Sequence, residues 1–239
     1  MSFSLKYRQV SPYIFEIIWP AEISEAILFD ILKLKNAIEK AADIPVQNMR
    51  ITYHHLSLAF DDAIDFKKLK SSIEKLYAKK EKFQIGERKC WEIPVLYEGK
   101  DLAEFAKTKK LPKQELIALH SSRDYLLYFF GFLPGFMYLG GLDARLHQAR
   151  KAVPDRKIEK GSVAIGGKQT GVYPLDSPGG WHVIGQTPIK IFELNANQHV
   201  FARAGDIIRF SAIEFNEFSE IESLVQQGKY KIKSKVVNG

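Results

Sequence analysis

The hydrophobic and polar positions of the first hundred residues alternate between two periods. Residues 13–19 form a nearly continuous apolar run, and residues 51–60 and 91–97 alternate between apolar and polar side chains. Such runs predict three β-strands. Between them, apolar residues recur at spacings of three and four over residues 23–38 and 66–76, which predicts two amphipathic helices. The order strand–helix–strand–helix–strand is typical of a small α/β sandwich.

The pattern changes after Gly99. We expect short helices over residues 101–108 and 111–120, and then a central strand over residues 123–132 with aromatic side chains on both faces. Further short apolar runs alternate with turns, which is typical of a β-barrel or β-sandwich. These runs are residues 162–165, 172–173, 181–184, 189–194 and 206–210. A late helix from Phe215 and an edge strand at residues 230–233 complete the prediction.

We therefore expect an α+β protein with an N-terminal α/β domain at residues 1–98 and a β-rich domain at residues 99–239. The 239 residues are 46% hydrophobic and 12% aromatic, enough to bury a core, so disorder is excluded. No segment approaches the roughly 20 apolar residues that a membrane helix needs. The first residues lack the apolar stretch of a signal peptide, and a cytoplasmic protein without membrane association is expected.

The formal charge of +7 raises the question of nucleic-acid binding. The Lys residues are scattered, and acids or apolar residues interrupt both local clusters. This distribution favours a solvated face over a phosphate track, so we expect no nucleic-acid partner. An anionic small-molecule substrate fits the charge equally well.

The sequence indicates no metal site. Cys90 is the single cysteine, so it forms no intramolecular disulfide and is expected to be a small core residue in a reducing compartment. His54 and His55 are neighbours in the predicted strand over residues 51–60. They should therefore point to opposite faces, one buried and one exposed, and cannot share a metal ion.

Glycine and proline concentrate between Gly131 and Pro188. This stretch contains 11 of the 16 Gly and 5 of the 10 Pro residues, and Gly-Gly occurs three times. Gly permits close approach of a second backbone or a ligand. A β-rich domain with many turns would explain part of this composition. The polar, aromatic and basic residues beside the Gly-Gly pairs favour a binding surface for a small polar ligand or a peptide.

Common nucleotide and catalytic motifs are absent. Gly167-Lys168 is the nearest approach to a P-loop, but Ser162 stands in place of the first Gly and Gln169 in place of the Ser or Thr. The P-loop match therefore fails. The sequence also lacks a Gly-x-Gly-x-x-Gly fingerprint after a strand, a His-Glu-x-x-His motif and a Gly-x-Ser-x-Gly elbow.

Three long motifs of this region resemble the KipI-like family, which includes the B subunit of bacterial 5-oxoprolinase and is related to carboxyltransferase domains of urea amidolyase. The motifs are residues 131–142 (GFLPGFMYLGGL), 161–174 (GSVAIGGKQTGVYP) and 177–181 (SPGGW). The resemblance implies an N-terminal α/β domain followed by a cyclophilin-like β-barrel. It also implies action with a C subunit and an A subunit to open 5-oxo-L-proline to L-glutamate, with ATP as cosubstrate.

Phosphorylation of the lactam oxygen would make it a leaving group, and such a site needs N–H, Lys and Arg donors for phosphoryl oxygens. The resemblance places candidate ligand-binding residues on the Gly-rich motifs, while the catalytic residues stay unassigned. The candidates are Gly166, Gly167, Lys168, Gln169, Thr170, Tyr173, Ser177, Gly179, Gly180 and Trp181, with Arg156 as a further cation. We expect Lys168 to lie in a turn that presents its side chain to a groove opposite residues 177–181.

The sequence departs from the family pattern at positions where relatives commonly carry arginine. Asp155 and Lys157 interrupt a Pro-Arg-x-Arg pattern, and Gln186 replaces Arg in Gly-Arg-Thr-Pro. Lys and Gln do not reproduce the planar, bidentate donors of Arg. Arg156 or Arg145 could substitute, and the sequence leaves this open.

Two further functions stay open at this level. A KipI-type protein would bind and inhibit a sensor histidine kinase, and a carboxyltransferase component is a third reading. For the enzyme, we expect a contact with the C subunit through an aromatic loop, because Phe, Met and Tyr are favoured at interfaces. The predicted contact residues are Phe136, Met137 and Tyr138.

Overall fold

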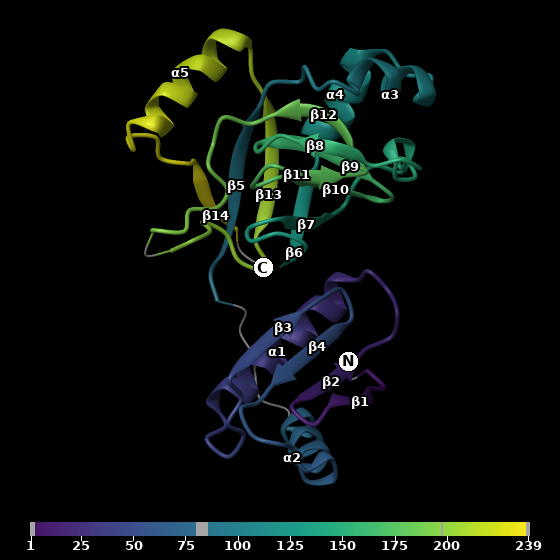
Figure 1. Cartoon of the computed structure of the whole chain (residues 1–239), viewed down its shortest axis with the longest axis vertical. Coiled ribbons are helices and arrows are strands. Elements are labelled where there is room, and N and C mark those ends of the chain that lie inside the picture. The colour runs from purple at the N-terminus through teal and green to yellow at the C-terminus, as the bar shows by residue number, and fades with distance from the viewer. Residues whose placement is uncertain (1–2, 80–85, 197, 238–239) are drawn as a thin grey trace. The chain divides into compact units, whose positions relative to one another are not determined.

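The computed structural model describes residues 3–79, 86–196 and 198–237. The chain divides into two units, residues 1–86 and 87–239, and each is considered by itself (Figure 1). Five α-helices and several β-sheets occur among the described residues. This mixture confirms the α+β class.

The first unit is a four-stranded antiparallel sheet with two helices. The sheet order is β1-β2-β4-β3. Its strands are β1 (Lys6–Ser11), β2 (Ile14–Ile18), β3 (Asn48–Ile51) and β4 (His55–Ala59), and its helices are α1 (Glu25–Lys40) and α2 (Phe66–Ala78). Inward-facing residues of β2 and β4 share one buried cluster with the apolar stripe of α1 and with Ile73 of α2. Both helices therefore pack against the same face of the sheet. The side chain of Asp65 accepts the Lys68 N–H at 3.1 Å, which caps α2 as predicted.

Two predictions for this unit are wrong. The strand expected over residues 51–60 is interrupted, because the chain turns after Ile51 and returns as β4, with the Thr52 N–H donating to the His55 carbonyl at 2.9 Å. Since His54 lies in this turn, the two histidines do not face opposite ways. Both are half-buried, and their rings lie 4.3 Å apart. The edge strand β1 was not predicted, because its residues are mostly polar and exposed.

The second unit contains an eight-stranded sheet of order β12-β9-β10-β7-β6-β13-β5-β14. Its strands are β5 (Arg88–Val95), β6 (Asp124–Phe130), β7 (Met137–Gly140), β9 (Ser162–Gly166), β10 (Gln169–Val172), β12 (His182–Gln186), β13 (Ile207–Ala212) and β14 (Ser234–Val237). The pair β13–β5 is parallel and the other pairs are antiparallel. Beyond β5, Leu96 and Gln186 exchange both backbone hydrogen bonds at 2.9 Å. This bridge joins the β5 end of the sheet back to β12.

Helices and a small sheet surround the large one. They are α3 (Leu102–Lys109), α4 (Lys113–Ser121), the 3-10 turn Ala144–Leu146, α5 (Phe215–Gln226) and the strands β8 (Asp155–Ile158) and β11 (Ser177–Gly179). The inward residues of the large sheet form the main core with apolar residues of the three helices. A second cluster lies on the outer side of β9 and β12 and includes Ile158 of β8. The small β8–β11 sheet therefore covers part of the large sheet from outside.

Two expected strands of the second unit differ from the structure. Residues 189–194 are irregular, although Ile189 and Ile191 are buried as an apolar strand would be. The edge strand expected at residues 230–233 lies further along, as β14. Apolar spacing marks the buried Ile189 and Ile191 and the half-buried Tyr230 and Ile232, but only pairing with another strand decides whether such a segment is a strand.

The division between the units falls before residue 87, whereas the sequence places the boundary at residues 98 and 99. Strand β5 causes the difference. It alternates like a strand of the first unit but forms its ladders with β13 and β14. Because these partners lie more than a hundred residues further along, the local pattern carries no trace of them.

This pairing predicts how truncated chains behave. A fragment of residues 87–239 should unfold cooperatively, whereas a fragment of residues 99–239 should not, because it lacks the strand between β13 and β14 and the buried side chains of Ile93 and Val95. Thermal unfolding followed by circular dichroism distinguishes the two fragments. A cooperative transition of the shorter fragment at the temperature of the longer one would contradict the boundary before residue 87.

Candidate functional site

An aromatic cluster fills the space between the β8–β11 sheet and the larger sheet. The rings of Tyr173 and Trp181 both meet the ring of Phe136 edge-on, with centroids 5.2 and 5.3 Å apart. All three side chains are nearly completely buried. Such edge-to-face contacts hold aromatic rings in defined orientations. The cluster therefore fixes the positions of the segments that carry it.

Two Gly-rich motifs meet at this cluster because their glycines have no side chains to keep the rings apart. A Cβ atom on Gly166 would lie 2.4 Å from the indole of Trp181, and one on Gly179 would lie 2.4 Å from the hydroxyl of Tyr173. Both distances are far inside van der Waals contact. The motifs at residues 161–174 and 177–181, separate in sequence, thus form one structure.

Lys168 lies at the tip of the β9–β10 hairpin. Gln169 pairs with Gly166, so Gly167 and Lys168 form the connecting turn. Gly167 has φ +67°, a left-handed value that favours Gly, and the space beside it is open. Lys168 is exposed and Gln169 half-buried. The predicted turn is present and the Lys168 side chain is exposed, while its presentation to a groove opposite residues 177–181 stays a prediction.

Thr170 has a different role from the predicted one. It is completely buried, and its hydroxyl donates to the Ala164 carbonyl at 3.0 Å. Nε2 of His120 lies 2.8 Å from the hydroxyl oxygen of Thr170. Nδ1 of His120 lies 2.7 Å from the Tyr97 hydroxyl. Since the Thr170 proton goes to Ala164, His120 carries its proton on Nε2 and accepts from Tyr97. Burial lowers the pKa of His120 to about 3. Thr170 thus belongs to a buried polar chain and contacts no ligand surface.

Tyr173 and Ser177 are also interior residues. Burial raises the pKa of Tyr173 to about 12, against a smaller lowering effect of the Trp181 backbone. Tyr173 therefore stays protonated, and its ring packs in the cluster with Phe136. Ser177 is buried, and its hydroxyl has no hydrogen-bond partner within the described residues.

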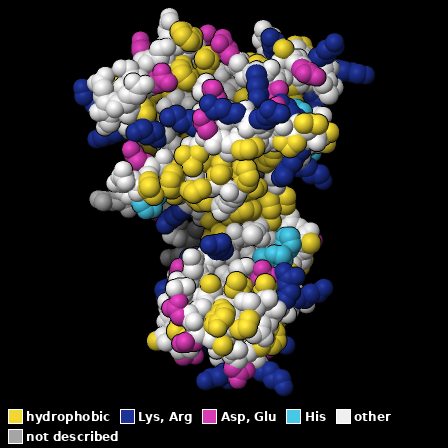
Figure 2. All heavy atoms as spheres, viewed as in Figure 1, with side chains coloured by type: hydrophobic (Ala, Val, Ile, Leu, Met, Phe, Trp, Pro, Cys, Tyr) yellow, Lys and Arg dark blue, Asp and Glu magenta, His cyan; other side chains and the backbone are white. Residues whose placement is uncertain are grey.

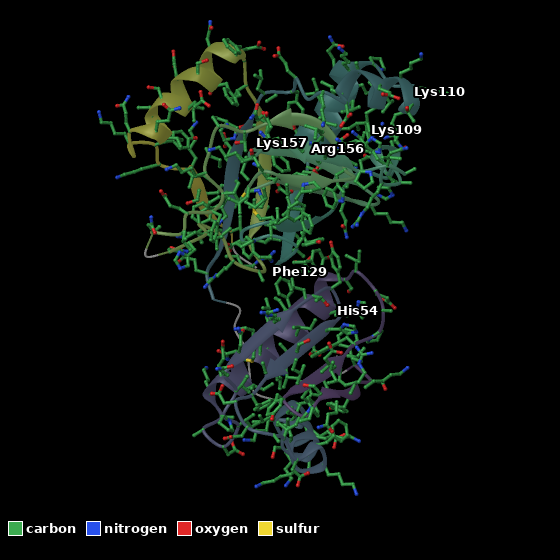
Figure 3. The ribbon with its side chains drawn as sticks, in the orientation of Figure 1. His54, Lys109, Lys110, Phe129, Arg156 and Lys157 are labelled. Carbon is green, nitrogen blue, oxygen red and sulfur yellow. The ribbon has the colours of Figure 1, made fainter. Side chains whose placement is uncertain are left out.

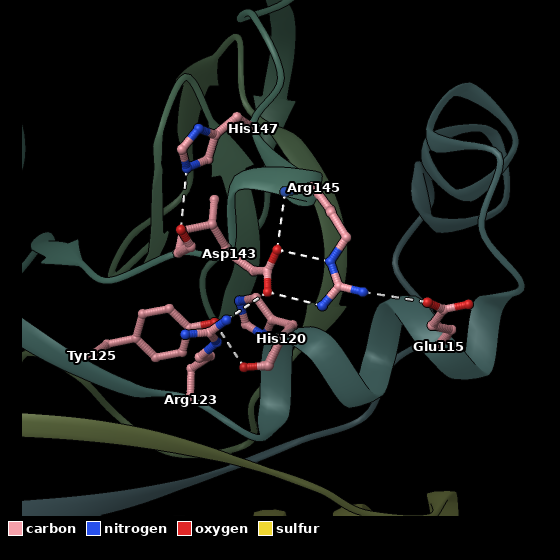
Figure 4. Close-up of polar contacts among 8 residues, drawn as sticks. Glu115, His120, Arg123, Tyr125, Asp143, Arg145 and His147 are labelled. Carbon is pink, nitrogen blue, oxygen red and sulfur yellow. Dashed lines mark hydrogen bonds and ion pairs between the residues drawn. The ribbon is translucent and has the colours of Figure 1, made fainter.

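Arg145 and Arg156 are the two candidates to replace the missing family arginines. Arg145 is engaged, because its guanidinium holds the buried carboxylate of Asp143 at 3.0 Å and lies 3.5 Å from Glu115 (Figure 4). Hydrogen bonds from Arg145 and Arg123 hold the pKa of Asp143 well below its usual range. Arg156 on β8 is exposed (Figure 3) and forms no ion pair among the described residues. Of the two, Arg156 has its guanidinium available to a ligand.

The positions that depart from the family arginines are occupied by paired or exposed groups. Asp155 lies 2.8 Å from Lys151 and 2.9 Å from Lys100, and these cations lower the pKa of its carboxyl against the raising effect of burial. Lys157 pairs with Asp176 at 3.0 Å. Gln186 is exposed, with its backbone in the bridge to Leu96. None of these side chains provides a planar, bidentate donor.

Residues 148–151, which sequence reasoning did not single out, lie along both Gly-rich motifs. Gln148 and Gly167 exchange two backbone hydrogen bonds, at 2.9 and 2.6 Å, and the Lys151 N–H donates to the Gly180 carbonyl at 2.7 Å. The Arg150 guanidinium carbon lies 5.7 Å from the centre of the Trp181 ring. Apart from the contact of Arg150 with Trp181, these are backbone hydrogen bonds, which leave no pattern of side chains in the sequence.

Two of the predicted partner contacts are wrong. Phe136 is 2% exposed and Met137 is completely buried. Tyr138 is half-buried, with its ring stacked on Phe129 at 4.5 Å. The exposed aromatic residue of this loop is Phe132, at 63%. Alternation along β7 turns Met137 into the main core, while Phe136 belongs to the cluster with Trp181.

The described part of the chain contains no group of three or more His, Cys, Asp or Glu side chains placed to hold a metal ion. In the same residues, every helix is too short or too polar to span a membrane.

With this geometry in place, comparison with known proteins identifies the class. The family model of the carboxyltransferase domain, subdomain C and D, matches residues 5–202, and the chain belongs to this family. Its curated relatives include the B subunit of 5-oxoprolinase from Bacillus subtilis, 39% identical over 72% of each chain. The corresponding B subunit from Haemophilus influenzae is 41% identical over 66% of this chain and 75% of its own. These similarities confirm the family resemblance and do not favour the KipI-type kinase inhibitor.

Solved structures agree with this assignment. The protein TTHA0988 superposes with a TM-score of 0.75 at 30% identity, covering 84% of this chain and 40% of its own. The Kluyveromyces lactis urea amidolyase superposes with a TM-score of 0.81 over 99% of this chain and 16% of its own. Its identity is 17%, so this likeness shows the fold alone.

The buried position of Thr170 predicts a stability effect. Thr170→Val should lower the free energy of unfolding by about 1–3 kcal/mol, because Nε2 of His120 would lose its buried partner. Lys168→Ala, two residues away in the same hairpin, is the matched control and should stay within about 0.5 kcal/mol of the original chain. Urea unfolding measures both. Equal stability of Thr170→Val and the original chain would exclude the buried polar chain.

Proposed function

We propose that this chain is the B subunit of an ATP-dependent 5-oxoprolinase, which acts with C and A subunits to open 5-oxo-L-proline to L-glutamate. The observation that carries the proposal is the 39–41% identity to two proteins named as B subunits of 5-oxoprolinase. That name supports a heteromeric complex. The C and A subunits, and ATP as cosubstrate, are further parts of the proposal.

The chemistry that we propose suits a site of fixed donors. An amide carbonyl is a poor electrophile, and transfer of a phosphoryl group from ATP to the lactam oxygen makes that oxygen a leaving group. The negative charge on the phosphoryl oxygens needs N–H and cationic donors that are already in place. The turn of Gly167 and Lys168 supports this role, because the space beside Gly167 is open and the Lys168 side chain is exposed.

The predicted site residues divide into two groups under this proposal. We assign ligand contact to the exposed or half-buried group, which comprises Gly167, Lys168, Gln169, Gly180 and Arg156. The buried group comprises Gly166, Tyr173, Ser177 and Trp181, and we assign it the role of stabilising the segments that carry the first group. Gly179 leaves room for the hydroxyl of Tyr173.

The proposal includes a cyclophilin-like barrel for the second unit and a cytoplasmic location. The bridge between Leu96 and Gln186 supports the barrel, because it joins the β5 end of the sheet to the opposite strand β12. Cys90 is the single cysteine of the sequence, so the fold relies on no intramolecular disulfide. This supports a reducing compartment.

An activity assay of the assembled subunits tests the function. The chain, co-purified with a C subunit, should consume ATP faster when 5-oxoproline is present, and addition of an A subunit should yield glutamate. Lys168→Ala should weaken the binding of a ligand by about 1.5–3 kcal/mol, the size of a hydrogen bond to a charged group. An intact complex whose ATP consumption ignores 5-oxoproline would contradict the proposal.

The partner contact that we propose uses Phe132. This residue is 63% exposed and has φ +62°, which is strained for a bulky side chain. Hydrophobic side chains also gather over the β6–β7 region on the face shown in Figure 2. An exposed aromatic residue kept in a strained conformation is suited to contact a C subunit.

Replacement of Phe132 tests this contact. Phe132→Ala should weaken the affinity for the C subunit, with a loss of about 2 kcal/mol, the size of an interface hot spot, and should leave folding nearly unchanged. Phe136→Ala is the contrasting variant, since loss of this buried ring should lower the free energy of unfolding by about 3–5 kcal/mol. Surface plasmon resonance and thermal unfolding separate the two effects. Unchanged affinity of Phe132→Ala for the C subunit would remove Phe132 from the interface.

A further inference from the structure

Arg150 is a cation at the edge of the aromatic cluster that has no counter-charge among the described residues. Its side chain is exposed, and no carboxylate of the described residues forms an ion pair with it. Its guanidinium carbon lies 5.7 Å from the centre of the Trp181 ring. Arg150 also contributes to the electrostatic environment of the Tyr173 hydroxyl. The cation therefore lies beside the two residues at which the Gly-rich motifs meet.

The backbone that carries Arg150 is fixed on both sides. Before it, Gln148 is paired with Gly167, and the Ala149 carbonyl accepts from Nε2 of His182 at 2.9 Å. After it, the Lys151 N–H donates to Gly180 at 2.7 Å. A ligand that binds the Arg150 side chain therefore does not have to order the backbone that carries it.

The neighbouring cation shows what a structural role looks like in this segment. Lys151 is 19% exposed in its side chain and lies 2.8 Å from both Asp101 and Asp155. These two carboxylates raise its pKa against the lowering effect of burial. Arg150, one residue earlier, is also basic but has no such pair within the part of the chain that the structure describes. The ion pairs of Lys151 hold the segment in place, and Arg150 remains available to a ligand.

The geometry points to Arg150 as the residue that binds an oxyanion of the ligand, a carboxylate or a phosphate. A guanidinium over an indole uses its face for the cation–π contact. Its edge keeps N–H donors in a fork that matches two oxygens of such a group. The backbone pair between Gln148 and Gly167 ties this segment to the turn of Lys168. This inference deepens the proposed function, because it assigns part of the same site.

Binding to the isolated full chain tests the inference by calorimetry. The probes are 5-oxoproline, 2-pyrrolidinone, which keeps the lactam ring and lacks the carboxylate, and inorganic phosphate. Arg150→Gln removes the charge and should weaken binding of the oxyanion probe by about tenfold to a hundredfold. Arg150→Lys keeps the charge without the fork and should recover part of the affinity. Arg50→Ala, at an exposed arginine of the first unit, is the control for lost charge.

The probes separate the two sources of the oxyanion. If Arg150 binds a carboxylate, Arg150→Gln should lose affinity for 5-oxoproline and leave the weaker binding of 2-pyrrolidinone unchanged. If it binds a phosphate, the loss should appear with inorganic phosphate. Unchanged melting temperatures show that the variants fold. Binding of every probe by Arg150→Gln as tightly as by the original chain overturns the inference, and so does a wild-type chain that binds no probe.

The outcome is independent of the assay with partner subunits. A complex that fails to couple ATP consumption to 5-oxoproline contradicts the proposed function, whereas the Arg150 variants are tested on binding by the chain alone. Arg150-dependent binding of phosphate or 5-oxoproline would stand even then. Conversely, if the complex is active and the chain binds all probes without Arg150, the proposed function stands and Arg150 is excluded from the ligand site.

Discussion

The candidate site depends on one constraint, the packing of the Trp181 indole directly against the backbone at Gly166 and Gly171. A Cβ atom on Gly166 would lie only 2.4 Å from the indole of Trp181, and a Cβ atom on Gly171 would lie 3.3 Å from it. Any larger residue at Gly166 must displace a ring that also contacts Phe136 and supports Arg150. The close packing of protein interiors leaves little room for such a shift. The absence of a side chain at Gly166 thus lets the indole occupy the place from which it contacts the Arg150 guanidinium.

The opposite faces of one short strand serve different purposes. Along β10, Thr170 and Val172 point into the main core, while Gly171 faces the aromatic cluster. A run such as Gln-Thr-Gly therefore cannot be read as one ligand-binding unit, because successive residues of a strand face opposite ways. Thr170 completes the hydrogen bonds of His120 in the interior. The hairpin thereby holds an exposed turn on a well-packed base.

The sequence predicted the helices and most strands, because their apolar periods are long and regular. It could not assign β5 to the second unit, since the pairing with β13 depends on residues far along the chain. The Gly-rich motifs correctly indicated segments that meet, although they did not distinguish buried residues such as Thr170 from exposed ones such as Lys168. Residues 148–151 have no apolar period, and backbone hydrogen bonds hold them. No pattern of side chains could have revealed them.

Whether a cation of this region is available to a ligand depends on whether it already forms an ion pair with a carboxylate. Arg145 faces Asp143, and Lys151 faces Asp101 and Asp155, so each contributes to a local ion pair. A ligand would have to compete with those carboxylates and leave them unpaired at a cost in free energy. Arg150 has no such competitor among the described residues, and its guanidinium carbon lies 5.7 Å from the centre of the Trp181 ring. An incoming oxyanion therefore gains the interaction without breaking another, which makes this arginine, rather than its better-connected neighbours, suited to recognise a ligand.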